Sequence, residues 1–197
     1  MRRRLHDLSL SIWTQLNDLP YPAYLLSMAV IGKQLAEIYA DQFPEKGRLL
    51  ARKTVDAVKT AYLSGEAAAD DAWQLHLGWQ QWLYDDVDDP NNEADGSAKM
   101  FSAMITFDLL ALELAGKVRL RTALDHVTNA AELPDPRFPA PAEPRLVQIV
   151  PAEDWAEEDS PAVQLMRKFE EVARLAARQH NTGLPCDPDQ FYSIAFG

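Results

Sequence analysis

The stretch "AYLLSMAVIGKQLAEIYADQF", residues 23–43, predicts a helix and with it the fold class. At 100° per residue, its charged side chains fall on one face and its apolar side chains on another. The charged positions are Lys33, Glu37 and Asp41, and the apolar positions are Tyr24, Met28, Ile31, Leu35, Ile38 and Tyr39. Its most apolar window, residues 23–32, is about half as long as a membrane span. We therefore expect an amphipathic helix whose apolar face is buried in a protein core.

Similar patterns on both sides of this stretch predict further helices, whose ends are marked by proline, glycine and capping residues. We expect helices over about residues 5–19, 23–43, 45–63, 70–87, 97–115, 119–131 and 160–179. Ser160 and Pro161 are a strong start signal for the last helix, because serine caps and proline fits the first turn. The inward stripe of that helix is Met166, Phe169, Ala173 and Ala176.

These elements predict a single all-α domain of about seven helices over residues 1–197, with the helices at 70–87 and 97–115 at its centre. Hydrophobic residues make up 47% of the chain and glycine is scarce, which favours helices over a turn-rich β architecture. Residues 133–160 are rich in proline and should form an extended strap before the last helix. Within that strap, "RLVQIV" (145–150) has the composition of one short strand.

The C-terminal segment, residues 184–197, is an apolar tail that is costly to expose. We expect it to dock on the body of the protein or on a second copy in a homodimer.

The net charge is −11, and the acid excess is concentrated in the middle of the chain. Residues 64–116 hold 11 Asp and Glu against one Lys, whereas residues 1–63 hold nine Lys and Arg against six acids. A negative field disfavours direct nucleic-acid binding and favours a basic partner or a cation. The alternative is that the acids serve colloidal stability alone.

The densest acidic stretch is "WLYDDVDDPNNEADGSAKMF", residues 82–101, between the two central helices. Its Asp85, Asp86, Asp88, Asp89, Glu93 and Asp95 would form an acidic rim beside Trp79 and Trp82. A second acidic stretch, "EDWAEED" (153–159), surrounds Trp155. Charge steers a basic protein toward such a surface, and aromatic anchors hold it. The alternatives are that the tryptophans are core residues and that Glu93 and Asp95 only stabilise the N-terminus of the following helix.

Acidic composition of this kind is typical of small bacterial proteins that neutralise a basic toxin. We therefore predict a non-enzymatic, protein-binding protein of the immunity or antitoxin type that inhibits a basic partner such as a nuclease toxin. The chain contains no HExxH, P-loop, GxGxxG or GxSxG motif, and the prediction includes no cofactor.

The pentapeptide "DDVDD", residues 85–89, carries an alternative prediction for the same acids. It matches the DDxxD pattern and so resembles the aspartate-rich motif of the all-helical terpenoid synthases. The resemblance implies that Asp85, Asp86 and Asp89 hold Mg²⁺, which in turn carries a substrate diphosphate. The resemblance covers five residues, and the rest of the chain contains no convincing second metal-binding motif. An EF-hand is excluded because Ser102 stands where the bidentate glutamate is required.

Asp108 is a candidate buried acid, because its neighbours by helical angle are apolar: Phe101, Met104, Leu112 and Ala115. A carboxyl group in such surroundings is protonated, paired or bound to a ligand. Its partner as a structural residue would be an arginine or a helix terminus, and the alternative is a functional acid. His76 lies on the apolar arc of its own helix, so we expect a hydrogen-bonded core histidine there.

Cysteine content and the N-terminus indicate the compartment. Cys186 is the only cysteine, so no internal disulfide forms and a reducing environment is the simplest interpretation. The basic run Arg2–Arg4 is followed by interrupting polar residues, which makes a poor signal peptide. We expect a cytoplasmic protein without a membrane segment.

Overall fold

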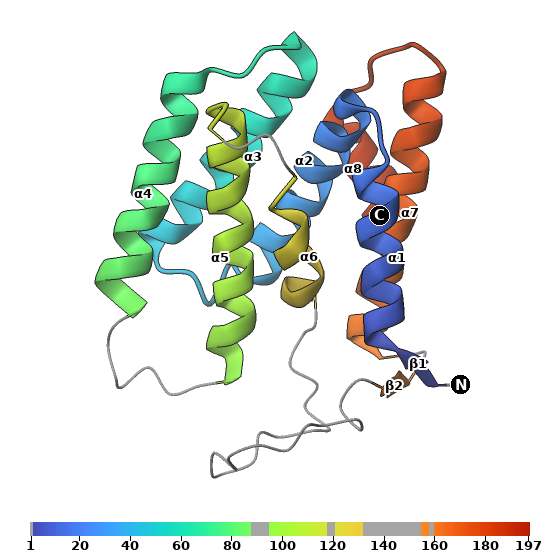
Figure 1. The fold of residues 1–197 in the computed structure, drawn as a ribbon, viewed down its shortest axis with the longest axis horizontal. Helices are drawn as coiled ribbons and strands as arrows, with labels where there is room; N and C mark the ends of the chain where they lie inside the picture. Colours follow the sequence, from blue (N-terminus) through green and yellow to red (C-terminus); the bar gives the residue numbers. More distant parts are fainter. Residues whose placement is uncertain (1, 88–94, 118–120, 132–154, 158–159) are drawn as a thin grey trace.

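The computed structural model describes residues 2–87, 95–117, 121–131, 155–157 and 160–197, and the side chains of 6–83, 100–117, 121–131 and 160–197. Within these ranges the chain forms eight helices and one pair of short strands (Figure 1). The helices are α1 (Leu5–Asn17), α2 (Tyr21–Ile38), α3 (Glu45–Ser64), α4 (Ala69–Val87), α5 (Asp95–Leu114), α6 (Leu124–Ala131), α7 (Pro161–Asn181) and α8 (Pro188–Phe196). The all-α prediction is confirmed, and the helix beyond the predicted seven lies in the C-terminal tail.

Helix α2 lies at the centre of the bundle, with α3 and α5 on one side and α1 and α7 on the other (Figure 1). Its predicted apolar face is buried except at its end, where Ile38 is half-buried. In the N-terminal half of the helix the opposite face is buried too, through Leu25, Leu26, Ala29 and Val30, whereas farther along that face Lys33 is half-buried and Glu37 is exposed. Helix α2 is covered on both sides in its N-terminal half because residues 23–32 are mostly apolar on every side. Of the two helices predicted at the centre, α5 packs on α3, α4 and α6, whereas α4 packs mainly on α3 and α5 at the edge of the bundle (Figure 1), so the prediction is wrong for α4. None of the described helices has the length and hydropathy of a membrane span.

The predicted helix ends are confirmed where caps were recognised. The Ser160 hydroxyl accepts a hydrogen bond from the Val163 N–H at the start of α7. Gly65 and Gly116 have φ angles of 75° and 69° after α3 and α5, in the left-handed region that glycine adopts without steric cost. All four residues of the predicted α7 stripe are buried.

The C-terminal tail docks on the body, as one of the two predictions for it required. Helix α8 begins after Asp187, whose carboxylate accepts from the Asp189 N–H, and it packs on α2 and α7. Phe191 is buried, and the Phe196 ring meets the Phe169 ring edge-on at 6.4 Å between centroids. The apolar side chains of the tail thus help to cover two other helices.

Helix α6 begins at Leu124, five residues later than predicted. The N–H groups of Leu124, Asp125 and His126 donate to carbonyls three residues back, which is a tight turn and not an α-helix. This turn frees Arg121 to reach the end of α1, as described below.

Two short strands join the N-terminus to the acidic stretch at 153–159. Strand β1 (Arg2–Arg4) pairs antiparallel with β2 (Trp155–Glu157), and Arg2 stands opposite Glu157. The strand proposed at 145–150 lies outside the described residues. The described part of the second acidic stretch is therefore bonded, through its backbone, to the most basic segment of the same chain.

Candidate functional site

Trp79 and Trp82, predicted as accessible anchors, are core residues, so that prediction is wrong. Trp79 is fully buried, stacks on Phe107 with 5.5 Å between ring centroids, and donates from Nε1 to the Thr54 hydroxyl at 3.0 Å. Trp82 is 3% exposed and lies directly on Gly47, where a Cβ atom would come within 2.3 Å of the indole. Neither indole can contact a partner while the core is intact.

One face of α4 is buried in the core. Ala72, Trp79 and Trp82 point into the core, whereas Leu77 is 43% exposed. Apolar side chains surround this helix, so the hydrophobic period alone does not select the buried side. The neighbouring helices select it, because α3 supplies Thr54 as hydrogen-bond acceptor and Gly47 as a space for Trp82.

The predicted acidic rim lies mostly outside the described residues. Asp85 and Asp86 belong to the last turn of α4, but their side chains are not described, and Asp88 and Asp89 are not described at all. For Trp155 only the backbone, in β2, is described. The alternative Mg²⁺ site at Asp85, Asp86 and Asp89 falls in the same region. Among the described side chains, no group of three or more His, Cys, Asp or Glu could hold a metal ion.

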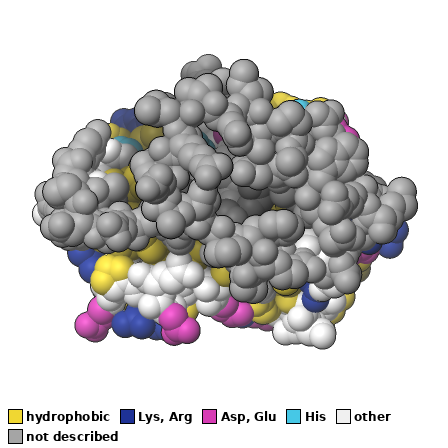
Figure 2. Space-filling model, turned by 90° about the horizontal axis from the view of Figure 1, so that it is seen from below, with side chains coloured by type: hydrophobic (Ala, Val, Ile, Leu, Met, Phe, Trp, Pro, Cys, Tyr) yellow, Lys and Arg dark blue, Asp and Glu magenta, His cyan; other side chains and the backbone are white. Residues whose placement is uncertain are grey.

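Figure 2 views the bundle from the end at which α4 stops and α5 begins. Along the visible rim of described side chains, acidic and basic groups are both present and are separated by hydrophobic and neutral surface. The prediction of an acidic face therefore depends on the acids of residues 85–95 themselves.

Asp108 is buried, as predicted, and it is paired across the α4–α5 contact. It is 4% exposed, and its two carboxylate oxygens lie 2.6 Å from His76 Nδ1 and 2.5 Å from Gln80 Nε2. Burial raises the pKa of Asp108 above its ordinary value of 3.8, while His76 and then Gln80 oppose that shift. Asp108 is thus paired with a histidine and an amide, whereas an arginine or a helix terminus was expected. The expectation of a hydrogen-bonded histidine at position 76 is confirmed.

The raised pKa of Asp108 predicts a pH dependence of stability that Asp108→Asn removes. The folded protein binds the Asp108 proton more tightly than the unfolded chain, so this contribution is complete below pH 3.8 and is lost as the pH rises through the folded pKa. Urea unfolding of both proteins between pH 4 and 7 should show the wild type losing stability relative to the variant. Each tenfold difference in the proton affinity of this carboxyl group between the folded and the unfolded protein corresponds to about 1.4 kcal/mol of unfolding free energy. Parallel pH profiles would contradict this account.

A second polar cluster, which the sequence did not predict, is formed by Arg121, Glu113 and Tyr24. Arg121 donates to the carbonyls of three residues at the end of α1, Leu16, Asn17 and Leu19. Its guanidinium lies 4.4 Å from the centre of the Tyr24 ring, and the Tyr24 hydroxyl donates to Glu113 Oε2 at 2.9 Å. Burial raises the pKa of Glu113, and the Tyr24 hydrogen bond and Arg121 counteract it. All donors and acceptors here serve the fold, so we assign the cluster a structural role.

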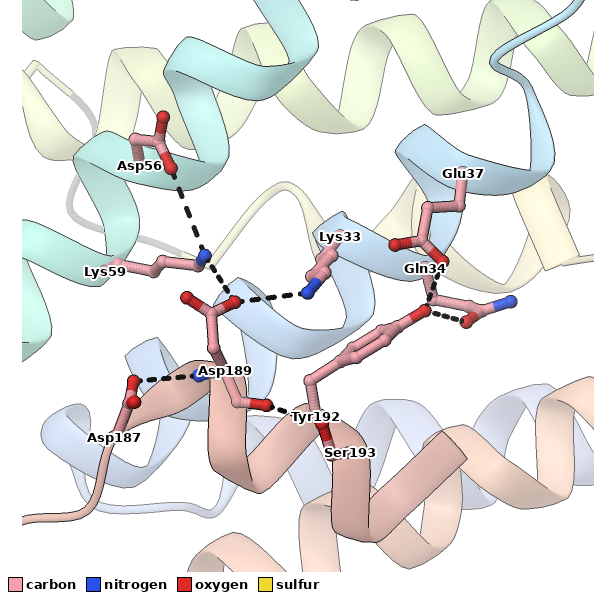
Figure 3. Close-up of polar contacts among 9 residues, drawn as sticks. All are labelled: Lys33, Gln34, Glu37, Asp56, Lys59, Asp187, Asp189, Tyr192 and Ser193. Atoms are coloured by element: carbon pink, nitrogen blue, oxygen red, sulfur yellow. Dashed lines mark hydrogen bonds and ion pairs between the residues drawn. The ribbon is translucent and has the colours of Figure 1, made fainter. Parts of the chain in front are cut away.

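A third polar cluster links α8 to a groove between α2 and α3 (Figure 3). Asp189 Oδ1 lies 3.1 Å from Lys33 Nζ on α2 and 2.7 Å from Lys59 Nζ on α3. The Lys59 hydrogen bond is the largest cause of the lowered pKa of Asp189. Tyr192 donates toward Gln34 and Glu37, and Lys33 Nζ lies 4.2 Å from the centre of its ring. One carboxylate of the C-terminal helix thus bridges the two helices that form the groove.

Comparisons with known proteins add nothing to this geometry. A scan against protein-family models found no match, and searches of curated proteins and of solved structures found none either.

Proposed function

We propose that this protein is a non-enzymatic binding protein for a basic protein partner, most concretely an inhibitor of the immunity or antitoxin type that acts on a partner such as a nuclease toxin. The antiparallel packing of α4 on α5 supports this proposal (Figure 1). Because α4 ends at Val87 and α5 begins at Asp95, the acids of 85–95 belong to two adjacent helix ends and the segment that joins them. Asp85, Asp86 and Asp95, which the structure describes by their backbone, thus stand at the same end of the helical pair.

Helix electrostatics separates these acids into two groups. Asp95 stands at the N-terminus of α5, where a negative charge stabilises the helix. Asp85 and Asp86 stand in the last turn of α4, where a negative charge opposes the helix dipole and destabilises it. Helix stability therefore accounts for Asp95 but not for Asp85 and Asp86, and a basic partner gives those two a role.

Because the indoles of Trp79 and Trp82 are buried in the core, they cannot anchor a partner. Charge must therefore contribute a larger share of the contact than the sequence predicted. Among the described residues, the accessible aromatic next to this segment along the chain is Phe101 on α5, which is 37% exposed. We therefore expect electrostatically steered binding that weakens with salt, with Phe101 as the apolar contact.

Two charge-matched double variants test this function. Asp85→Asn/Asp86→Asn should slow association with a basic nuclease by about two- to fivefold and reduce its salt dependence. The same variant should be more stable by a few tenths to about 1 kcal/mol, since it removes charge from a helix C-terminus. Association is measured by surface plasmon resonance at several NaCl concentrations, and stability by urea unfolding.

Asp70→Asn/Asp71→Asn is the control, because it makes the same charge change in the first turn of the same helix. It should leave the association rate within about twofold and should lower stability. Equal effects of the two variants on association would overturn the proposal, since they would show only a response to net charge. If a reading frame adjacent to this one encodes a basic nuclease, its product is the first partner to test.

A further inference from the structure

The α2–α3 groove is a cationic surface on an acidic protein, and it is distinct from the acidic helix ends discussed above. Four basic side chains line it: Lys33, Arg48, Arg52 and Lys59. Its floor is apolar and includes the buried Val55, and its volume is about 330 Å³. Arg48, Arg52 and Lys59 follow one another at helical spacing on α3, so a single helix face supplies most of the charge.

The two carboxylates of the groove do not neutralise all of these cations. Glu37 accepts from the Tyr192 hydroxyl, and Asp56 lies 4.0 Å from Lys59. Arg48 donates to the Ala40 carbonyl at 3.5 Å. Within the described part of the chain, Arg52 is exposed and has no carboxylate within ion-pair distance.

One end of the groove already holds a carboxylate from another element. Asp189 of α8 binds both Lys33 and Lys59, yet its side chain remains 54% exposed (Figure 3). The groove therefore accepts a carboxylate carried on a polypeptide, at the end where its two lysines converge. The other end, with Arg48 and Arg52, offers the same kind of donors without such an occupant among the described residues.

The length of the cationic row indicates the size of a ligand. From Arg48 to Lys59 the helix rises about 16 Å, at 1.5 Å per residue. An extended peptide of about five residues spans that distance. A single carboxylate or phosphate would engage only one end, whereas alternating acidic side chains would reach successive cations.

We propose that the α2–α3 groove binds an acidic segment of a polypeptide partner, and that Asp189 competes with it for Lys33 and Lys59. Binding to the 197-residue chain is tested by fluorescence anisotropy at low ionic strength, with a fluorescein-labelled peptide of about six glutamates. Arg52→Glu should weaken binding about tenfold or more, because it replaces an attraction with a repulsion. Asp189→Asn should strengthen binding about three- to tenfold, since it releases two lysines.

Lys53→Glu is the matched control, because Lys53 is the exposed neighbour of Arg52 on α3 and does not line the groove. It should change the affinity by less than about twofold. Far-ultraviolet circular dichroism and thermal melting verify that each variant is folded, and Arg52→Gln provides a milder change at the same position. Binding of the peptide by the Asp189→Asn variant alone would also support the proposal, because it would show that Asp189 blocks the peptide in the wild type.

Three results would overturn the proposal. The first is equal weakening by Lys53→Glu and Arg52→Glu, which would indicate a general charge effect. The second is a peptide affinity that is the same in the wild type and in Asp189→Asn, which includes the case in which neither of them binds the peptide. The third is displacement of the peptide by tripolyphosphate at lower concentrations than by unlabelled hexaglutamate, which would assign the groove to multivalent phosphates. None of these results depends on the acidic residues 85–95, so the proposed function is tested separately.

Discussion

Trp79→Ala should lower the free energy of unfolding by about 3–5 kcal/mol, the range measured when a buried tryptophan or phenylalanine is truncated. The fully buried indole stacks on Phe107, and its Nε1 donates to Thr54. Alanine would leave a cavity at the meeting point of α3, α4 and α5 and remove a buried hydrogen bond. Domains of this size are stable by only about 5–15 kcal/mol, so the variant should unfold at much lower urea concentration.

Leu77→Ala is the control for this prediction. Leu77 lies two residues from Trp79 on the same helix but is 43% exposed, so its truncation should cost less than about 1 kcal/mol. Trp79→Phe should fall between the two, because it keeps a ring against Phe107 and loses the bond to Thr54. Urea unfolding followed by circular dichroism measures all three. Similar losses for Trp79→Ala and Leu77→Ala would show that α4 does not bury the face described here.

Arg121→Ala should cost about 2–3 kcal/mol, which is the second-largest effect we expect. The last carbonyls of a helix have no partner within the helix, and here one guanidinium serves three carbonyls at the end of α1. Alanine would leave them to solvent and would remove the cation from the face of the Tyr24 ring. It would also remove a positive charge that lowers the pKa of Glu113, so the pKa of that buried acid should rise further.

Arg121→Lys separates charge from geometry. Lysine keeps the positive charge, but its single ammonium cannot reproduce the planar fork that reaches several carbonyls at once. It should recover less than half of the stability lost in Arg121→Ala. Full recovery by lysine would mean that the charge near Glu113, and not the capping of α1, is the main contribution. Urea unfolding at pH 7 gives the stabilities, and repeating it at lower pH reports the change at Glu113.

Helices with strong local signals could be predicted from the sequence. In α7, Ser160 and Pro161 mark the start and the stripe of Met166, Phe169, Ala173 and Ala176 marks the buried face. These signals act within one or two turns, so they are complete in the sequence. Asp108 was predicted to be buried for the same reason, since its apolar neighbours stand on its own helix.

Residues whose role depends on another helix could not be predicted. His76 and Gln80 reach Asp108 from α4, and Arg121 reaches α1 from a turn more than 100 residues later in the chain. The cationic groove had a weak signal in the spacing of Arg48, Arg52 and Lys59 on α3, but Lys33 and Asp189 join it from two other helices. The register between helices brings these groups together, and no local pattern encodes that register.

The amino-acid sequence by itself determined the helical class, most helix ends, the burial of Asp108 and the concentration of acid at 85–95, because spacing, caps and charge are local properties of the chain. Only the tertiary structure decided that α2 is central, that Trp79 and Trp82 are core residues, and that Asp189 bridges Lys33 and Lys59. The physical reason is that a helix with apolar residues on every side can be rotated about its axis at little local cost. The neighbours that it meets, through cavities, rings and hydrogen-bond partners, then select one orientation.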